Sequence, residues 1–353
     1  MIENPTGQRI SILRFVLIFG VVLLHVPPYV PIAELEPGSF AWIKAFFQHA
    51  VFRCSVPVLT VVSGYLLFRS GLDLHYGKLV QKKVRTLLVP FLAFNLPLVA
   101  MVVLLQAQAG MSISTQLVPF DWPTMLDAAL GLTAPPVNYP LNFLRDLFVL
   151  ALLAPLLGWL LRRAPWLGLA LVLVVALENL DKELVLRTEM LVTFYLGGLA
   201  ALHRWNLQAW DRFAWPCLAL FVAACAFVVE TREPNTAWLG MAAPLLVWPA
   251  ASLLVGTRPG GWLARMSRHS FFLFLTHSVL LVVAWEAYQR LGEPIPYPLF
   301  WVATPVLATA LLVGVHALGT RHLTGLFDLL LGARTAPRDA VNPPPIGAAE
   351  SRA

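Results

Sequence analysis

The sequence predicts an all-α polytopic membrane protein with about ten transmembrane helices. Hydrophobic residues make up 58% of the 353 residues and charged residues only 12%, and the mean hydropathy is +0.73. A soluble domain normally carries about 25% charged residues. Apolar runs recur along the whole chain, and about 18 to 20 such residues suffice to cross the hydrocarbon layer of a bilayer. Together, the composition and the repeated runs predict many membrane crossings.

Most of the apolar segments are long enough to cross a bilayer. The ten segments cover residues 10–30, 49–68, 86–106, 140–161, 166–180, 187–203, 213–230, 236–256, 269–289 and 297–318. The fifth is the weakest, because its apolar stretch is short, and a re-entrant or half-spanning helix is an alternative there. We expect one membrane domain over residues 1–332, followed by a disordered proline-rich cytoplasmic tail at 333–353.

Loop charges predict the orientation, because cytoplasmic loops carry an excess of lysine and arginine. Basic-rich and basic-poor loops alternate through all the segments; residues 69–85 hold several Lys and Arg, whereas residues 107–139 hold none. Both termini are therefore expected in the cytoplasm and residues 107–139 outside. The alternation also favours a full crossing for the fifth segment. The outer loop is expected to contain either a short interfacial helix near Trp122 to Leu130 or only irregular structure.

Several classes of protein are excluded by the same features. The net charge is +6, but the basic residues lie in short loops between apolar runs, which argues against nucleic-acid binding. The cysteines, Cys54, Cys217 and Cys225, form neither a disulfide framework nor a metal-binding pattern. The first apolar run is longer than a signal-peptide core and lacks a small-residue cleavage site, so it is expected to be a retained helix.

Ionisable residues inside a membrane are costly and indicate functional sites. Arg14 and His25 are eleven residues apart on the first predicted helix. This spacing is close to three turns, so both project from one face, separated by roughly 16 Å along the axis. The helix thus offers a cation nearer the cytoplasm and a titratable base in the outer half. The alternatives are a topology-setting arginine and a hydrogen-bonded packing histidine.

Several short motifs follow one another along the chain from about residue 9 to 280. The first is an arginine, ten residues and a histidine, here Arg14 and His25. The others are Arg53 to Pro57 with Ser63-Gly64-Tyr65, the basic run Lys82 to Pro90, Asn142 to Leu147, Phe194 to Gly198, and Ser270 to His277. In this order the motifs resemble those of the acyltransferase-3 membrane family. The chain departs from the family pattern at Ser11, where Asp is usual, and at Asn142, where Trp is common.

The resemblance implies an acyl donor, usually acetyl-CoA, that is used from the cytoplasm as a substrate rather than as a tightly bound cofactor. It also implies a glycan acceptor at the outer face of a bacterial inner membrane. His25 is then expected to act as general base, and a neutral imidazole suits that role. The CoA phosphates are expected to lie against Lys82, Lys83 and Arg85. The alternative for this cluster is that it only sets the topology.

Further site candidates lie near the expected depth of His25. Arg53 and Arg145 are expected to polarise the thioester carbonyl and stabilise the oxyanion. Asp146 is expected to pair with an arginine or to orient His25, and an interfacial salt bridge is the favoured interpretation. Ser63 beside Gly64 is a possible nucleophile, but small residues more often permit close helix packing, which we favour.

His277 and Glu286, in the ninth segment, are further candidates for the wall of a cavity. His316 is a weaker one, because it lies close to the cytoplasmic boundary. A polytopic transporter or flippase is the alternative function, but the paired repeats common in transporters are not evident. A non-catalytic scaffold is a third possibility. The acceptor glycan, the choice between acetyl and succinyl transfer, and the oligomeric state remain open at this level.

Overall fold

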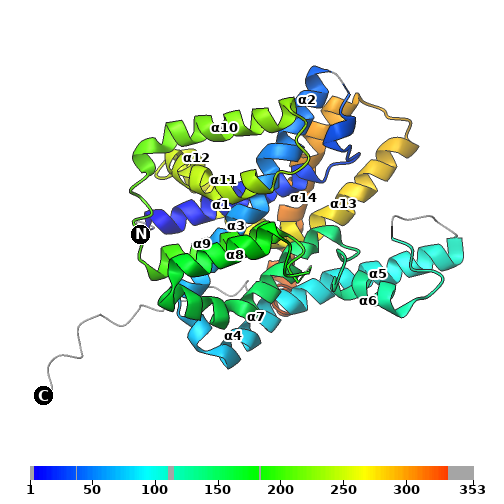
Figure 1. The fold of residues 1–353 in the computed structure, drawn as a ribbon. Coiled ribbons are helices and arrows are strands. Elements are labelled where there is room, and N and C mark those ends of the chain that lie inside the picture. The colour runs from blue at the N-terminus through cyan, green and yellow to red at the C-terminus, as the bar shows by residue number, and fades with distance from the viewer. Residues whose placement is uncertain (1–3, 37, 110–114, 183, 333–353) are drawn as a thin grey trace, which may run out of the picture.

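The computed structural model describes residues 4–36, 38–109, 115–182 and 184–332, and these residues form a helical bundle without strands (Figure 1). The helices are α1 (Pro5–Leu24), α2 (Ser39–Ala45), α3 (Ser55–Arg69), α4 (Tyr76–Lys83), α5 (Val89–Ala109), α6 (Trp122–Leu130), α7 (Asn142–Arg163), α8 (Pro165–Leu177), α9 (Thr188–Leu202), α10 (Ala214–Glu230), α11 (Ala237–Ala250), α12 (Arg258–Met266), α13 (Ser270–Arg290), α14 (Tyr297–His322) and α15 (Thr324–Leu330). The predicted tail at 333–353 lies outside the described residues.

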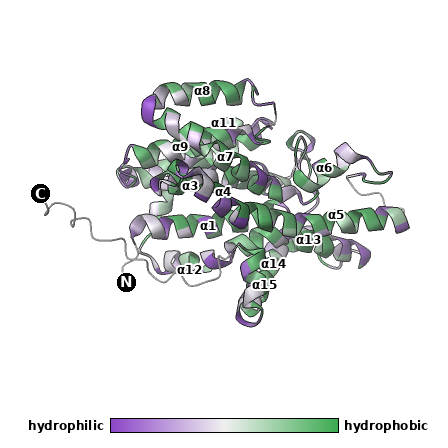
Figure 2. Ribbon diagram, turned by 90° about the horizontal axis from the view of Figure 1, so that it is seen from below, coloured by the Kyte–Doolittle hydropathy of each residue, from purple (hydrophilic) through white to green (hydrophobic). Residues whose placement is uncertain are grey.

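Within the described residues, eight helical segments are long and apolar enough to cross a membrane. They are Pro5–Leu24, Ser39–Arg69, Tyr76–Gln108, Tyr139–Arg163, Asp211–Glu230, Ala237–Leu254, Arg258–Arg290 and Tyr297–His322. Two shorter apolar helices, α8 and α9, complete the set of ten predicted segments. Hydrophobic residues dominate along these helices (Figure 2). The all-α polytopic class is therefore confirmed.

The weak fifth segment corresponds to α8, a helix of 13 residues. Such a helix is about 20 Å long, which is less than the thickness of the hydrocarbon core. It starts directly after α7 ends, yet the chain that follows it reaches the other end of α7, where the backbone N–H of Leu186 donates to Asp146 (3.1 Å). The chain thus returns along the whole length of α7, because the described residues after α8, 178–182 and 184–187, are non-helical and lead back to the start of α7.

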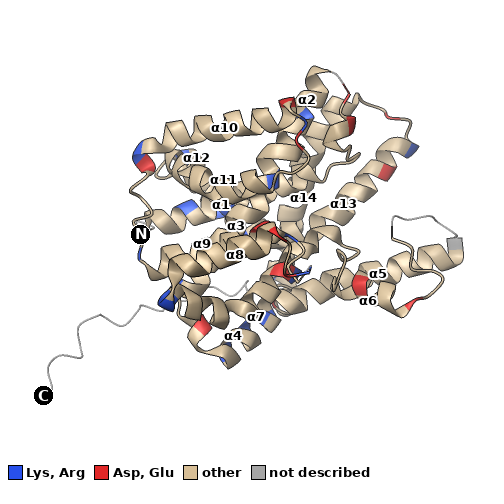
Figure 3. Ribbon diagram, viewed as in Figure 1, with Lys and Arg blue, Asp and Glu red and all other residues tan. Residues whose placement is uncertain are grey.

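The basic-rich loops gather on one face of the bundle, and charged residues lie mainly near the helix ends (Figure 3). The buried Arg9 guanidinium near the start of α1 pairs with Asp211, with Nη2 2.6 Å from Oδ2. At the end of α7, Arg162 forms an ion pair with Asp73, which follows α3. These contacts join loops that the charge pattern assigns to the same side.

The contacts of the opposite face likewise join loops that the charge pattern groups together. The hydroxyl of Tyr297, at the start of α14, donates to the carbonyl of Pro27, after α1 (3.0 Å). The Lys44 ammonium donates to the carbonyl of Pro28 (2.7 Å). The loop predicted to lie outside contains helix α6, so the expected helix is confirmed, and its position at the membrane interface stays a prediction.

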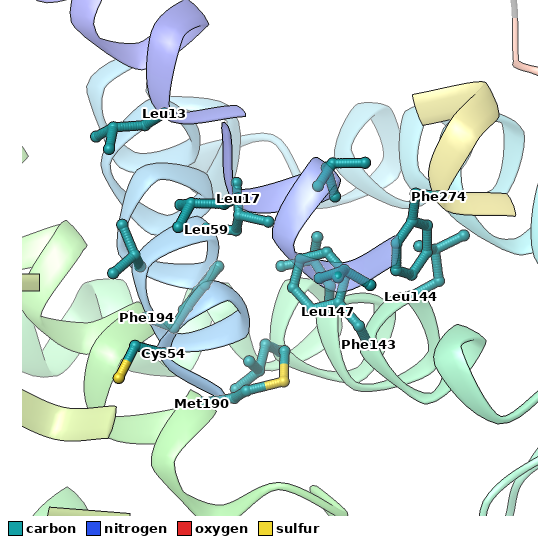
Figure 4. Packing of buried hydrophobic residues seen from close by; sticks show 14 of the residues in the cluster. Leu13, Leu17, Cys54, Leu59, Phe143, Leu144, Leu147, Met190, Phe194 and Phe274 are labelled. Atoms are coloured by element: carbon teal, nitrogen blue, oxygen red, sulfur yellow. The ribbon is translucent and has the colours of Figure 1, made fainter. Parts of the chain in front are cut away.

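The core forms where α1, α3, α7 and α9 meet (Figure 4). Its closest contact is between α3 and α9, where two glycines bring the backbones together. A Cβ atom at Gly64 would lie 2.3 Å from the carbonyl oxygen of Phe194, and one at Gly197 would lie 2.2 Å from that of Val61. Ser63 Oγ donates to the carbonyl of Leu59 in its own helix (2.8 Å). The Ser63-Gly64 pair therefore serves helix packing.

We expect Gly64→Ala to destabilise the bundle, because a methyl group there meets backbone that cannot rotate away. Overpacking of this kind costs about 1–3 kcal/mol. The apparent melting temperature of the protein in detergent measures the loss. The matched control is Gly314→Ala in α14, where an added Cβ has nothing within 4 Å and alanine favours the helix. Equal melting temperatures for the two variants would contradict this account of the α3–α9 contact.

Candidate functional site

His25 follows the last residue of α1, which places its ring at the C-terminal end of that helix. Asn4 caps the start of α1 by accepting from the N–H of Thr6 (3.1 Å), and Pro5 occupies the first turn. His25 Nδ1 lies 2.8 Å from the carbonyl oxygen of Val21. A carbonyl can only accept, so Nδ1 carries the proton and Nε2 carries the lone pair. The nitrogen available to a substrate is therefore a proton acceptor.

His277 of α13 lies behind His25, with its Nε2 atom 3.4 Å from His25 Nδ1. The Nδ1 atom of His277 lies 2.9 Å from the carbonyl oxygen of Phe274, so it donates there and Nε2 is left as an acceptor. The Nδ1–H group of His25 thus faces two acceptors, the Val21 carbonyl and His277. Both orient the ring, and both would stabilise the imidazolium that forms when Nε2 takes up a proton.

His25 lines a cavity of about 30 Å³, roughly the volume of one water molecule. The lining residues are Val21, Leu24, His25, Phe52, Arg53, Val56, Tyr139, Pro140, Asn142, Arg187 and Phe274. Phe274 packs edge-on against Phe143 in the core below, with ring centroids 5.6 Å apart (Figure 4). The cavity is thus lined mainly by apolar residues, and the basic residues of its lining are His25, Arg53 and Arg187.

Arg53 is held in place by a chain of hydrogen bonds. Its Nη2 atom donates to the hydroxyl of Tyr29 (2.7 Å), which lies 3.2 Å from His49 Nδ1. His49 Nε2 lies 2.8 Å from the carbonyl oxygen of Val30 and must donate to it. His49 Nδ1 is therefore the acceptor for the Tyr29 proton. The donor and the acceptor are thus defined for each of these three hydrogen bonds, and together they hold the Arg53 guanidinium in place at the wall of the cavity.

Arg187, the last residue before α9, supplies the second guanidinium. Its backbone N–H donates to Asp146 Oδ2 (3.0 Å), and the N–H of Leu186 donates to Oδ1 of the same carboxylate. Asp146 is fully buried and thereby fixes the backbone from which Arg187 projects. The Arg187 side chain lies 3.8 Å from Glu189. Asp146 thus acts on the cavity through Arg187 and does not contact His25.

The structure does not bring Arg145 to this cavity. Its Nε donates to the carbonyl of Gly131 (2.7 Å) and its Nη2 to that of Leu132 (2.8 Å). Nη1 donates to the carbonyl of Leu184 and to Asp146 (2.9 Å). This one guanidinium joins two loops, at Gly131–Leu132 and at Leu184, to the start of α7, and its role is therefore structural. The favoured expectation of an ion pair for Asp146 agrees with these contacts.

The remaining candidates lie away from the cavity. Arg14 is exposed near the middle of α1, between the basic face and His25. Lys82 and Arg85 are exposed and Lys83 is half-buried, near the end of α4. Glu286 lies 3.6 Å from Arg290 on an exposed part of α13.

His316 contacts His269 rather than the cavity, with their Nδ1 atoms 2.8 Å apart. Arg268 Nε donates to His269 Nε2 (3.0 Å). His269 directly precedes α13, so this second histidine pair lies about two helical turns from His277 along that helix. Among the described residues, no group of three or more His, Cys, Asp or Glu side chains could hold a metal ion.

The sequence analysis missed Arg187, Tyr29, His49 and Tyr139 as parts of the site. Arg187 and His49 lie at helix ends, where charged and polar residues are common and carry no signal of their own. Asn142, where the family commonly has tryptophan, also lines the cavity.

Comparison with known proteins supports the same interpretation of the chain. Residues 8–317 match the model of the acyltransferase-3 family, described as an acyltransferase domain. The chain is 37% identical over 368 aligned positions to the succinoglycan biosynthesis protein ExoH of Rhizobium meliloti (strain 1021), covering 98% of this chain and 97% of that protein. No solved structure matches the chain. The chain therefore belongs to the acyltransferase-3 family and is a multi-pass membrane O-acyltransferase.

Proposed function

We propose that this protein transfers an acyl group from acyl-CoA, bound on the basic face, to a hydroxyl group of an exported polysaccharide at the opposite face. The observation that carries the proposal is that His25 lines a small cavity together with Arg53 and Arg187, with its Nδ1 bonded to the Val21 carbonyl and its Nε2 left as a proton acceptor. The relative from Rhizobium meliloti, named for the biosynthesis of an exopolysaccharide, supports a polysaccharide acceptor. The alternation of loop charge supports a cytoplasmic basic face in a bacterial inner membrane.

In the proposed reaction, an acceptor hydroxyl gives its proton to His25 Nε2 while its oxygen bonds to the thioester carbon. The resulting oxyanion lies between the guanidinium groups of Arg53 and Arg187, which stabilise the negative charge. The tetrahedral intermediate then collapses, the carbon–sulfur bond breaks, and the imidazolium returns its proton to the departing thiolate. The products are an ester and free CoA. His277 and the Val21 carbonyl stabilise the imidazolium during the step.

The donor is proposed to approach from the basic face, because the CoA nucleotide is polyanionic and Lys82, Lys83, Arg85 and Arg14 lie on that side of His25. Arg14 and His25 lie on one face of α1, roughly 16 Å apart along its axis. An extended, uncharged pantetheine arm suits this distance. Acetyl-CoA is the proposed donor, and succinyl-CoA is the competing one, since two guanidinium groups in the wall can also pair with a carboxylate.

The direct test uses purified full-length protein in detergent or vesicles. We expect it to release CoA thiol from acetyl-CoA and to transfer the acyl group to alkali-deacylated polysaccharide from the same strain, detected by mass spectrometry of the glycan. Parallel assays with succinyl-CoA rank the two donors. A transporter would give neither thiol release nor ester formation with any acyl-CoA, and that result would remove the proposal.

We expect the double variant Lys83→Gln and Arg85→Gln to raise the KM for the CoA donor, because two charges that attract its phosphates are lost. The KM for the acceptor should be unaffected. The control is topology: a cysteine at position 115 should be labelled from outside, and one at position 78 only after permeabilisation, in both the parent and the variant. An unchanged donor KM in correctly inserted protein would mean that the cluster only sets topology.

A further inference from the structure

We propose that a second cavity beside the catalytic one holds one neutral hexose residue of the acceptor glycan. This inference rests on the proposed function and adds the place where the acceptor binds. The cavity has a volume of about 220 Å³ and lies between residues 29–33, the region before α3, and residues 233–236, the loop between α10 and α11. Arg53 lines both this outer cavity and the His25 cavity.

The two volumes assign different roles to the two cavities. The His25 cavity, at about 30 Å³, can admit a hydroxyl group or a carbonyl group but not a sugar ring. The outer cavity, at about 220 Å³, equals roughly seven water molecules at about 30 Å³ each, which is room for one pyranose ring. Because Arg53 is common to both walls, a ring in the outer cavity can direct one hydroxyl past Arg53 toward His25.

The lining of the outer cavity suits a carbohydrate. The ring of Tyr29 is half exposed, and Pro31 and Pro234 add further apolar surface against which the C–H face of a sugar can pack. Glu233 and Thr236 supply hydrogen-bonding groups for sugar hydroxyls. A concave site with apolar walls and a few fixed polar groups is the usual form of a small-molecule site.

The polar groups of this wall are held in place before any ligand binds. Glu233 Oε1 accepts from the N–H of Asn235 (2.9 Å), which orients the carboxylate. Tyr29 is held between Arg53 and His49 by the hydrogen-bond chain described above. A preformed wall lowers the cost of ordering side chains on binding. Since the Glu233 carboxylate and the Arg53 guanidinium carry opposite charges, the cavity favours a neutral sugar over an acidic one.

The test blocks the outer cavity without touching the residues around His25. In Thr236→Cys, a benzyl methanethiosulfonate attached to the new thiol should fill the cavity, because its aromatic ring is about as large as a sugar ring. We expect transfer to alkali-deacylated polysaccharide to fall at least about ten-fold. The slower hydrolysis of acetyl-CoA in the absence of glycan, in which water takes the acyl group and CoA thiol is released, should continue. The matched control is Thr231→Cys, an exposed threonine in the same region that does not line the cavity. Reagent-treated parent protein corrects for its own cysteines, of which Cys54 and Cys225 are buried.

A second variant measures binding without a reagent. Glu233→Gln keeps an oxygen for the Asn235 N–H but loses the charge, so the KM for the same polysaccharide should rise about ten-fold, the scale of one hydrogen bond to a charged group. The donor KM should not move. Glu230→Gln, at the end of α10 and outside the cavity, is the matched control, because its amide oxygen can still accept from Trp42 Nε1.

The outcomes separate this inference from the function on which it rests. Loss of both transfer and thiol release on labelling Thr236→Cys would assign the outer cavity to the donor and overturn the inference. Unchanged transfer after labelling, with an unchanged acceptor KM in Glu233→Gln, would also overturn it while leaving the acyltransferase mechanism intact. Failure of the parent protein to release thiol or to form ester would instead remove the proposed function, and the inference with it.

Discussion

His25→Ala is expected to abolish acyl transfer while leaving the protein folded in the membrane. The loss should be at least about 10²-fold, the usual contribution of a positioned general base. The Nε2 lone pair is the group that takes the acceptor proton, and no second imidazole replaces it, because the nearest one, His277, donates from Nδ1 to its own helix and directs Nε2 at His25. Acyl incorporation into the glycan, at matched protein levels in the membrane, measures the effect.

Two further variants separate the loss of the base from damage to the fold. His25→Asn keeps a polar side chain but cannot accept a proton at neutral pH, so it should be as inactive as the alanine variant. His322→Ala removes an exposed histidine at the end of α14, on the opposite face, and should retain parent activity. Near-normal incorporation by His25→Ala would show that His25 is not the catalytic base and would overturn the proposed mechanism.

Arg187→Gln is expected to lower kcat by about 10²–10³, the range seen when one oxyanion-stabilising donor is removed. The backbone of Arg187 is held by Asp146, so the substitution removes the guanidinium without removing the contacts that position the residue. Arg187→Lys retains the charge but not the planar pair of donors, and partial activity is expected. The measurement is kcat for transfer at saturating donor and acceptor.

The control for this prediction is Arg232→Gln, which removes an exposed arginine outside both cavities and should leave kcat unchanged. Arg145→Gln offers a contrast of a different kind. Because its guanidinium joins two loops to α7, the melting temperature of this variant should fall. If Arg187→Gln kept full kcat, Arg187 would line the cavity without acting in the reaction.

The sequence by itself determined the all-α polytopic class and the positions of the apolar helices, and it predicted two loop faces and His25 as the catalytic base. Hydropathy and loop charge are properties of consecutive residues, so they can be evaluated before anything is known of how helices pack. The spacing of Arg14 and His25 is equally local, because both lie on or directly after one helix. The motifs placed the chain in its family for the same reason.

Only the tertiary structure decided which side chains meet. His25 and His277 lie 252 residues apart in the chain, and their contact depends on the packing of α1 against α13. Arg145 and Arg187 both lie at the N-terminal ends of helices, and nothing in their local sequence separates a structural arginine from one that lines the cavity. The Arg145 guanidinium donates hydrogen bonds to the carbonyl groups of Gly131, Leu132 and Leu184. Arg187, in contrast, lines the cavity. Which arginine lines the cavity therefore depends on where loops distant in sequence lie, and the residues around each arginine do not encode those positions.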